Sequence, residues 1–164
     1  MTTDALSSAM AHARETLLAL EDLLRELPDA DLHRAEPGGG WTCAQVVSHI
    51  HLCGLLWIAD LERLAQHPGQ AMFMFREELG HDAVGASPPS SRDAAERLAS
   101  LREAMERCMP AVDPAVLSKS LEVPTLRTMT VAVWLPLIMG HLAGHADQLR
   151  AILRSRGVMP AAVA

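Results

Sequence analysis

The sequence predicts an all-α fold in which four helices, joined by long connections, form a bundle. Its 164 residues are 49% hydrophobic and 21% charged, an ordinary globular balance, so we expect a single domain over residues 1–164. Aromatic residues make up only 3%, with no Tyr, so that Leu, Ala and nine Met must fill the core. Such a mixture favours helices over a sheet. Apolar residues also recur at spacings of three and four, the period of a helix that packs through one side.

The charge and the start of the chain exclude several classes of protein. Asp and Glu total 20 against 14 Lys and Arg, a net charge of −6, so we expect no nucleic-acid partner, because phosphate binding needs clustered basic residues. No uninterrupted apolar run approaches the ~20 residues of a membrane span, and no secretory signal opens the chain. Three separated cysteines, Cys43, Cys53 and Cys108, fit a reducing compartment, and we expect a cytoplasmic protein without a membrane partner.

A stripe of apolar residues marks the first predicted helix, from about Asp4 to Leu27. Its members alternate spacings of four and three: Leu6, Met10, Ala13, Leu17, Leu20, Leu24 and Leu27. Pro28 ends this helix. Residues 29–40 then form a connection that closes on three consecutive glycines.

The second predicted helix begins with an unusually complete signal. Thr42 and Gln45 are spaced as a capping box, and Trp41 can pack on Val46 as a hydrophobic staple. The helix runs to about Gln66 and is apolar on nearly all sides. We therefore expect it to be the most buried helix of the bundle.

The third predicted helix starts at Ser90 or Ser91 and ends before Pro110. Its apolar residues repeat the spacing of the first helix. The charge-rich faces of the first and third helices, such as Glu21-Asp22 and Arg102-Glu103, are interpreted as solvent-exposed.

The chain then becomes irregular before the last helix. Residues 111–129 are expected to be extended, with one turn around residues 115–119, since two prolines interrupt them. The last helix is predicted from Thr130 to about residues 154–156, with a bend near Pro136, which lacks a backbone donor.

Histidines on two of these helices are the candidate metal ligands. His141 and His145 lie one turn apart and about 40° around the helix axis, so both imidazoles can reach one ion. Chance alone gives about 0.4 such pairs in this composition, so the pair gains its weight from facing the bundle. His49 lies on an inward stripe of the second helix. Gly140 and Gly144 flank the pair, which indicates either close approach of another helix or room for a ligand.

The other histidines, Asp60 and Cys53 are not expected to be metal ligands. His51 points away from His49, and Asp60 is about three turns from it, too far to share an ion. Cys53 has ligand spacing to His49, but a lone cysteine on an apolar stripe is more often a small core residue. The remaining histidines are interpreted as solvated: His12, His33, His67 and His81.

We also expect particular residues to enclose the site. Residues 70–90, with at most a short turn around residues 74–79, are rich in Gly and Pro and would form a wall or lid. Trp134 lies near the stripe of His141, about two turns earlier, so it is expected to contact the site, whereas Trp57 is expected to anchor the core.

Two short motifs resemble the DinB/YfiT-like superfamily of bacterial four-helix proteins. One is Gly40-Trp41-Thr42 followed by Val46-Val47-Ser48-His49, and the other is Thr130 followed by His141-Leu142-Ala143-Gly144-His145-Ala146-Asp147-Gln148. The helix order and spacing match over essentially the whole chain. The resemblance implies a bundle with crossover connectivity and a divalent metal held by His49, His141 and His145. Gln148 is expected at most to contact a ligand of that metal and not the metal itself.

The resemblance also implies a range of functions. Members of the superfamily include thiol-dependent S-transferases and a mycothiol-dependent maleylpyruvate isomerase. Three protein ligands with open positions are typical of a catalytic metal, here zinc, nickel or iron, which could hold a low-molecular-weight thiol as thiolate. We expect such a transferase acting on a small-molecule substrate and, as an assembly, a homodimer.

Two alternatives remain open at this point. A metal-dependent hydrolase is less favoured, because Leu142 stands where the metalloprotease motif has its Glu, and no carboxylate adjoins the ligands in sequence. A non-catalytic metal-binding stress-response module would keep the bundle and the histidines without an acid–base partner.

Overall fold

The all-α fold is confirmed by the computed structural model, which describes residues 3–34, 40–67, 87–123, 127–155 and 157. Four long helices dominate this part of the chain: α1 (Thr3–Arg25), α3 (Cys43–Gln66), α5 (Ser91–Cys108) and α7 (Val131–Ser155). Shorter elements link them: α2 (Asp29–Leu32), η2 (Met109–Ala111), α6 (Pro114–Leu117), β1 (Ser120–Val123) and β2 (Arg127–Thr130).

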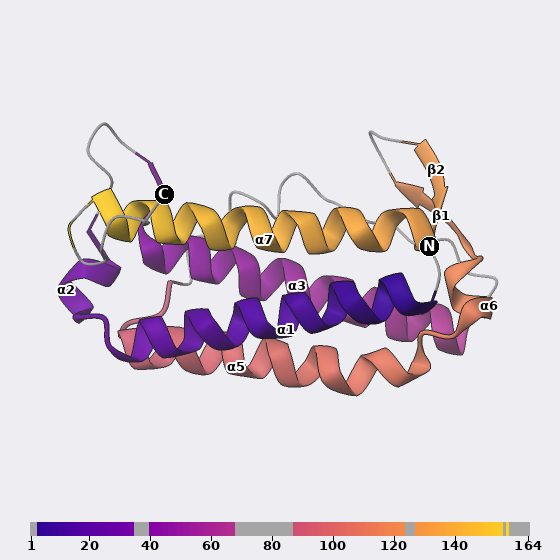
Figure 1. Cartoon of the computed structure of the whole chain (residues 1–164), viewed down its shortest axis with the longest axis horizontal. Helices are drawn as coiled ribbons and strands as arrows, with labels where there is room; N and C mark the ends of the chain where they lie inside the picture. Colours follow the sequence, from indigo (N-terminus) through magenta and orange to yellow (C-terminus); the bar gives the residue numbers. More distant parts are fainter. Residues whose placement is uncertain (1–2, 35–39, 68–86, 124–126, 156, 158–164) are drawn as a thin grey trace.

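The four long helices form a bundle with crossover connectivity (Figure 1). Helices α1 and α7 run in one direction, and α3 and α5 run in the other. Both α1 and α3 pack on α5 and on α7, so α1 and α3 lie on opposite corners. Two long-range hydrogen bonds fix the ends: Ser91 N donates to Asp29 Oδ1 at 2.7 Å, and Lys119 Nζ donates to the Leu64 carbonyl at 2.7 Å. The end of α3 and the start of α5 therefore lie at opposite ends of the bundle.

The capping box predicted for α3 is confirmed. Thr42 Oγ1 accepts from Gln45 N at 3.2 Å, and Gln45 Oε1 accepts from Thr42 N at 2.8 Å. Helix α5 starts in a similar way, with Ser90 Oγ accepting from Asp93 N at 3.1 Å. Side-chain acceptors thus satisfy backbone donors that have no partner inside the helix.

Two connections are more regular than the sequence predicts. Residues 29–40 include the one-turn helix α2, and residues 111–129 include α6 and an antiparallel hairpin in which Ser120 pairs with Thr130. Four-residue strands are too short for their alternation to stand out from a helical pattern. Val131 N donates to the Lys119 carbonyl at 2.9 Å, so the hairpin leads directly into α7, where Pro136 lies inside the helix. The turn predicted at residues 74–79 and most of the predicted lid lie outside the described residues.

Helix α3 is the most buried of the long helices, as predicted. Thirteen of its 24 residues are buried, and they join two adjoining clusters of the core. By length and composition alone α3 could cross a membrane, and it is the only helix of the described residues for which this holds. However, 61% of that stretch is buried inside the bundle, where its apolar side chains pack on the other helices.

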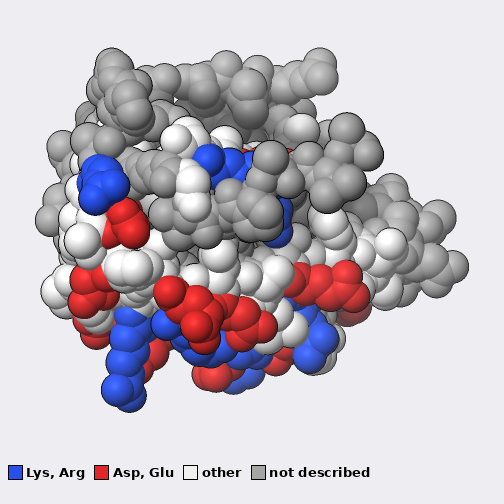
Figure 2. All heavy atoms as spheres, turned by 60° about the vertical axis from the view of Figure 1, so that its left-hand side comes forward, with Lys and Arg blue, Asp and Glu red and all other residues white. Residues whose placement is uncertain are grey.

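The interpretation of Glu21 and Arg102 as solvent-exposed is wrong. The Glu21 side chain is only 1% exposed, and Arg102 Nε donates to its Oε1 at 2.8 Å between α1 and α5. Other charges do lie on the surface, where Figure 2 shows acidic and basic side chains intermixed over the part of the molecule that α1 and α5 form. Arg14 and Glu106, for example, pair at 2.9 Å with both side chains exposed.

The glycines that flank the histidine pair do not mediate close packing. A Cβ built on Gly140 or Gly144 meets no atom of the described residues within 4 Å. Close approach occurs instead at Gly54 on α3, where a Cβ would collide with the side chain of Leu101 on α5. Glycine is therefore required by packing between α3 and α5 and not beside the histidines.

Candidate metal centre

Histidines from α3 and α7 meet at the interface of these two helices. His49 lies in the second turn of α3, just after the capping box, and it is 4% exposed. His141 and His145 project from successive turns of α7 and are half-buried. Because α3 and α7 run antiparallel side by side, the first half of α3 lies against the second half of α7 (Figure 1).

The structure brings the three predicted residues together. The Nε2 atoms of His49 and His141 face each other at 3.0 Å. The ring centroid of His145 lies 4.4 Å from that of His49 and 4.4 Å from that of His141. All three imidazoles therefore belong to one cluster.

Cys53 also belongs to this cluster, although its sequence context favoured a small core residue. Its Sγ lies 3.7 Å from both Nδ1 and Nε2 of His49. The potential ligand atoms of His49, Cys53 and His141 all lie within 4.8 Å of one another, and this is the one such donor group in the described part of the chain. The signal that could have found it is the spacing of four between His49 and Cys53, which places both side chains on one face of α3.

His145 is held by a hydrogen bond of its own. Its Nδ1 lies 2.8 Å from Gln148 Oε1, one turn further along α7. An amide oxygen only accepts, so Nδ1 carries the proton and Nε2 keeps a lone pair. His145 lies outside the tight donor group of His49, Cys53 and His141, although its ring contacts both histidines.

Two indoles lie against the imidazoles, those of Trp41 and Trp57. Neither is Trp134, the residue that the sequence predicts at the site. Trp41 stacks on His145 with ring centroids 5.8 Å apart and also contacts His49 at 4.9 Å. Trp57 meets His141 edge-on at 5.4 Å. The expectation that Trp134 and not Trp57 contacts the site is wrong, since it is Trp57 whose ring meets His141. Trp57 and Trp134 are buried in the same core cluster, so Trp57 also anchors the core as expected.

Burial favours the uncharged forms of His141 and Cys53. It lowers the pKa of His141, and the nearby His145 lowers it further. Burial also raises the pKa of the Cys53 thiol to about 11. Neutral imidazoles present lone pairs, which is the state in which histidine binds metals.

The remaining titratable residues lie away from this cluster, as expected. His51 is half-buried elsewhere on α3, where burial and then Arg97 lower its pKa. Asp60 pairs with Arg63 at 2.8 Å, and burial raises its pKa against the opposing effect of that arginine. His12, His33 and His67 are exposed, as predicted, whereas His81 lies outside the described residues.

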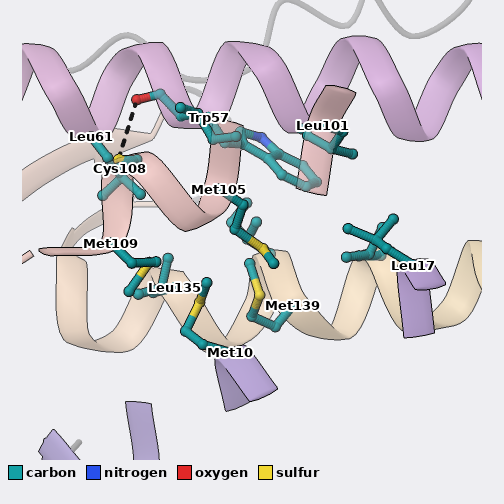
Figure 3. Close-up of a pocket in the computed structure, with 14 residues that line it drawn as sticks. Met10, Leu17, Trp57, Leu61, Leu101, Met105, Cys108, Met109, Leu135 and Met139 are labelled. Carbon is teal, nitrogen blue, oxygen red and sulfur yellow. Dashed lines mark hydrogen bonds between the residues drawn. The ribbon is translucent and has the colours of Figure 1, made fainter. Parts of the chain in front are cut away.

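An apolar cavity is lined in part by Trp57, the indole that contacts His141 (Figure 3). Methionines from α1, η2, α5 and α7 line it: Met10, Met109, Met105 and Met139. Its volume is about 30 Å³, and no polar surface lines it. A space of this size and character stays dry and is too small for a substrate, so it belongs to the core.

The donor set fits a divalent transition metal. Imidazole nitrogens and a thiol sulfur are ligands that suit zinc, nickel and iron, and they do not suit magnesium or calcium. The Nε2 atoms of His49 and His141 hydrogen-bond to each other at 3.0 Å, and this separation is close to that of two ligands of one ion. The fold and this cluster together define a helical bundle with a candidate metal centre.

The chain belongs to the DinB superfamily, whose family model matches residues 12–149. The matched region contains both motifs on which the sequence resemblance rests. In a comparison with curated proteins, no match was found.

Three solved structures share the fold of this chain. YfiT from Bacillus subtilis, described as a probable metal-dependent hydrolase with an unusual four-helix bundle topology, has a TM-score of 0.76 at 18% identity over 96% of this chain and 90% of its own. A DinB-like protein from Bacillus cereus ATCC 10987 has a TM-score of 0.71 at 16% identity, over 99% and 98%. A mutant of the mycothiol-dependent maleylpyruvate isomerase has a TM-score of 0.71 at 14% identity, over 91% and 63%. At these identities the comparisons show a shared fold.

Proposed function

We propose that this chain is a metal-dependent enzyme that joins a low-molecular-weight thiol to a small electrophile. His49, His141 and His145 would hold a divalent ion, namely zinc, nickel or iron. The observation that carries the proposal is the meeting of three imidazoles at the α3–α7 interface, with two ring nitrogens 3.0 Å apart. When bound, such an ion stabilises a coordinated thiol as the thiolate, which is the nucleophilic form.

The residues of the chain would hold this site in place. Gln148 Oε1 accepts a hydrogen bond from Nδ1 of His145, which leaves Nε2 of that ring as the nitrogen that binds the ion. Trp41 and Trp57 pack against His145 and His141 and keep water from two sides of the cluster. The capping box of Thr42 and Gln45 fixes the first turn of α3, two turns before Cys53 and next to His49.

The chemistry of the cluster favours thiol transfer over hydrolysis. Its donor group in the described residues contains imidazoles and a thiol but no carboxylate that could act as a general base on water. In a thiol transfer, the sulfur forms a bond to an electrophilic carbon while the leaving group departs with its electron pair. The thiol proton passes to solvent, so no further acid–base group is essential.

Metal-dependent hydrolysis is the second candidate, because YfiT is described as a probable metal-dependent hydrolase. It would need water in the place of the thiol. A binding module without turnover would share the metal but neither reaction.

The test begins with metal analysis of the purified protein and reconstitution with zinc, nickel or iron. Metal-loaded protein is then incubated with aryl halide and epoxide electrophiles in the presence of glutathione, bacillithiol or mycothiol. The thioether products are quantified by mass spectrometry. We expect turnover with at least one thiol and none with a His145→Ala variant.

Other results would point elsewhere. Ester or amide cleavage without any thiol would favour the hydrolase. Stoichiometric metal binding with no turnover above the His145→Ala background would favour the binding module. Failure of the wild-type protein to bind any divalent ion would contradict the proposed function altogether.

A further inference from the structure

The sulfur of Cys53 faces the same point as the two closest imidazole nitrogens. It is 3.7 Å from His49 Nε2, and that nitrogen is 3.0 Å from His141 Nε2. The thiol is buried within the α3–α7 half of the bundle, in contact with an imidazole. An ordinary core cysteine would have only apolar neighbours.

These distances can be compared with those around a tetrahedral ion. With Zn–N of about 2.0–2.1 Å and Zn–S of about 2.3 Å, two nitrogens are about 3.3 Å apart, and a nitrogen and a sulfur about 3.6 Å apart. The observed separations of 3.0 Å and 3.7 Å differ from these edges by no more than a few tenths of an ångström. Two edges of a coordination tetrahedron, both at His49 Nε2, are therefore close to their expected lengths, and the ligand atoms of all three residues lie within 4.8 Å of one another.

We propose that Cys53 is a further ligand of the ion at His49 and His141, and that it occupies the position a substrate thiol takes during the reaction. This inference rests on the proposed metal site. Together with His145 it makes a set of four donors, which is the closed set of a resting site. A small thiol would open the site by replacing one sulfur with another.

The proposed exchange balances in protons and needs no oxidant. When Cys53 coordinates, its S–H bond breaks, the sulfur keeps the electron pair, and the proton passes to solvent. When an incoming thiol takes its place, that thiol loses a proton and Cys53 regains one. The number of thiolates at the site is unchanged.

Cobalt(II) is the probe that tests this assignment. A thiolate bound to cobalt gives a charge-transfer band in the near ultraviolet, which imidazole ligands alone do not give. We expect the band in the cobalt-loaded wild-type protein without added thiol. It should be lost in Cys53→Ser, which should still show the visible ligand-field bands of cobalt held by histidines. Addition of 2-mercaptoethanol to this variant should restore the charge-transfer band, since a position is then open.

Cys108→Ser is the matched control. Like Cys53, Cys108 is buried, and burial raises its thiol pKa to about 11 as well. It lies on α5 with its Sγ 4.0 Å from the Ile58 carbonyl, so this variant should keep the charge-transfer band.

A measurement on the wild-type protein avoids any folding defect of the variants. Alkylation of each cysteine is followed by mass spectrometry with and without zinc. When zinc fills about nine-tenths of the sites, alkylation of Cys53 should slow about tenfold more than that of Cys108, because only the free fraction reacts.

Two outcomes would overturn the assignment while leaving the proposed function intact. One is ligand-field bands in the wild-type protein without the charge-transfer band. The other is equal zinc protection of Cys53 and Cys108. If the wild-type protein bound neither cobalt nor zinc, the metal site itself would be wrong, and the role of Cys53 would fall with it.

Discussion

The α1–α5 and α3–α7 interfaces both bury polar side chains, but the partners of these side chains differ in kind. Between α1 and α5, Glu21 is 1% exposed, and its carboxylate accepts from Arg102 at 2.8 Å and from Arg25 at 3.3 Å. Hydrogen bonding to Glu21 raises the pKa of Arg102, so the guanidinium keeps its charge. Between α3 and α7, groups of the same kind face one another: two imidazole nitrogens at 3.0 Å with a thiol beside them.

This difference distinguishes a structural polar cluster from a candidate functional one. A buried carboxylate with two guanidinium partners is satisfied within the protein and needs nothing more. The nitrogens of His49 and His141 share one hydrogen bond at 3.0 Å, and neutral imidazoles held this close together can also bind a cation supplied from outside.

Replacement of His141 by Ala should have the largest effect. Loss of a partner in the outer shell of a metal typically lowers affinity by about 10–100-fold, so loss of a ligand should lower zinc affinity by more than about 100-fold. Competition with a chromogenic chelator measures this. His51→Ala is the control, because His51 lies on α3 away from the cluster and should leave zinc affinity unchanged. Equal affinity in both variants would contradict the proposed site.

Glu21→Gln should break the other interface and leave the metal centre intact. Removing the charge leaves the guanidinium of Arg102, whose side chain is 16% exposed, with only the exposed carboxylate of Glu106 at 3.5 Å. We expect the free energy of unfolding to fall by about 3 kcal/mol in denaturant melts, with zinc stoichiometry unchanged. In Asp22→Asn, an exposed carboxylate is lost, and the change should stay within about 0.5 kcal/mol. Comparable losses in both variants would show that burial of Glu21 does not matter.

Gln148→Ala should weaken metal binding without unfolding the protein. It removes the acceptor that orients His145 and should reduce zinc affinity about 10–100-fold. Asp147→Asn, on the exposed side of the same turn, serves as the control in the same chelator competition. A zinc affinity equal to that of the control would mean that Gln148 does not position the ring.

Thr42→Ala should lower stability by roughly 0.5–2 kcal/mol through loss of the α3 cap. The matched change Ser90→Ala removes the corresponding cap of α5 and should cost a similar amount. Only the Thr42 variant should also lower zinc affinity, because only α3 carries His49. An unchanged melting midpoint for Thr42→Ala would show that the cap contributes nothing measurable.

Gly140→Ala should have the smallest effect and a stabilising one. Ala is favoured over Gly in a helix by roughly 1 kcal/mol, and the added methyl meets no described atom. Gly54→Ala should do the opposite, since its methyl would collide with Leu101. Thermal melts of the two variants that shifted in the same direction would contradict this account of the glycines.

The sequence by itself determined the helices and the histidines. Local signals were sufficient for the start of α3, because a capping box involves only Thr42 and Gln45 and needs no other part of the chain. The periodicity of apolar residues likewise placed His49, His141 and His145 on inward faces. Four-residue strands, in contrast, leave too short a pattern, so the hairpin of β1 and β2 was missed.

Only the tertiary structure decided which side chains meet across helices. Trp134 was expected at the site because it shares a stripe with His141, but seven residues separate them by about 10 Å along the axis. Trp57 is at the level of His141 because α3 and α7 run antiparallel, and no spacing within one helix reveals this. The pair of Glu21 and Arg102 was misjudged for the same reason. Cys53 is different, because its spacing of four from His49 within α3 already indicated the contact. Periodicity gives the direction of a side chain from its own helix, whereas the packing of neighbouring helices decides what it touches.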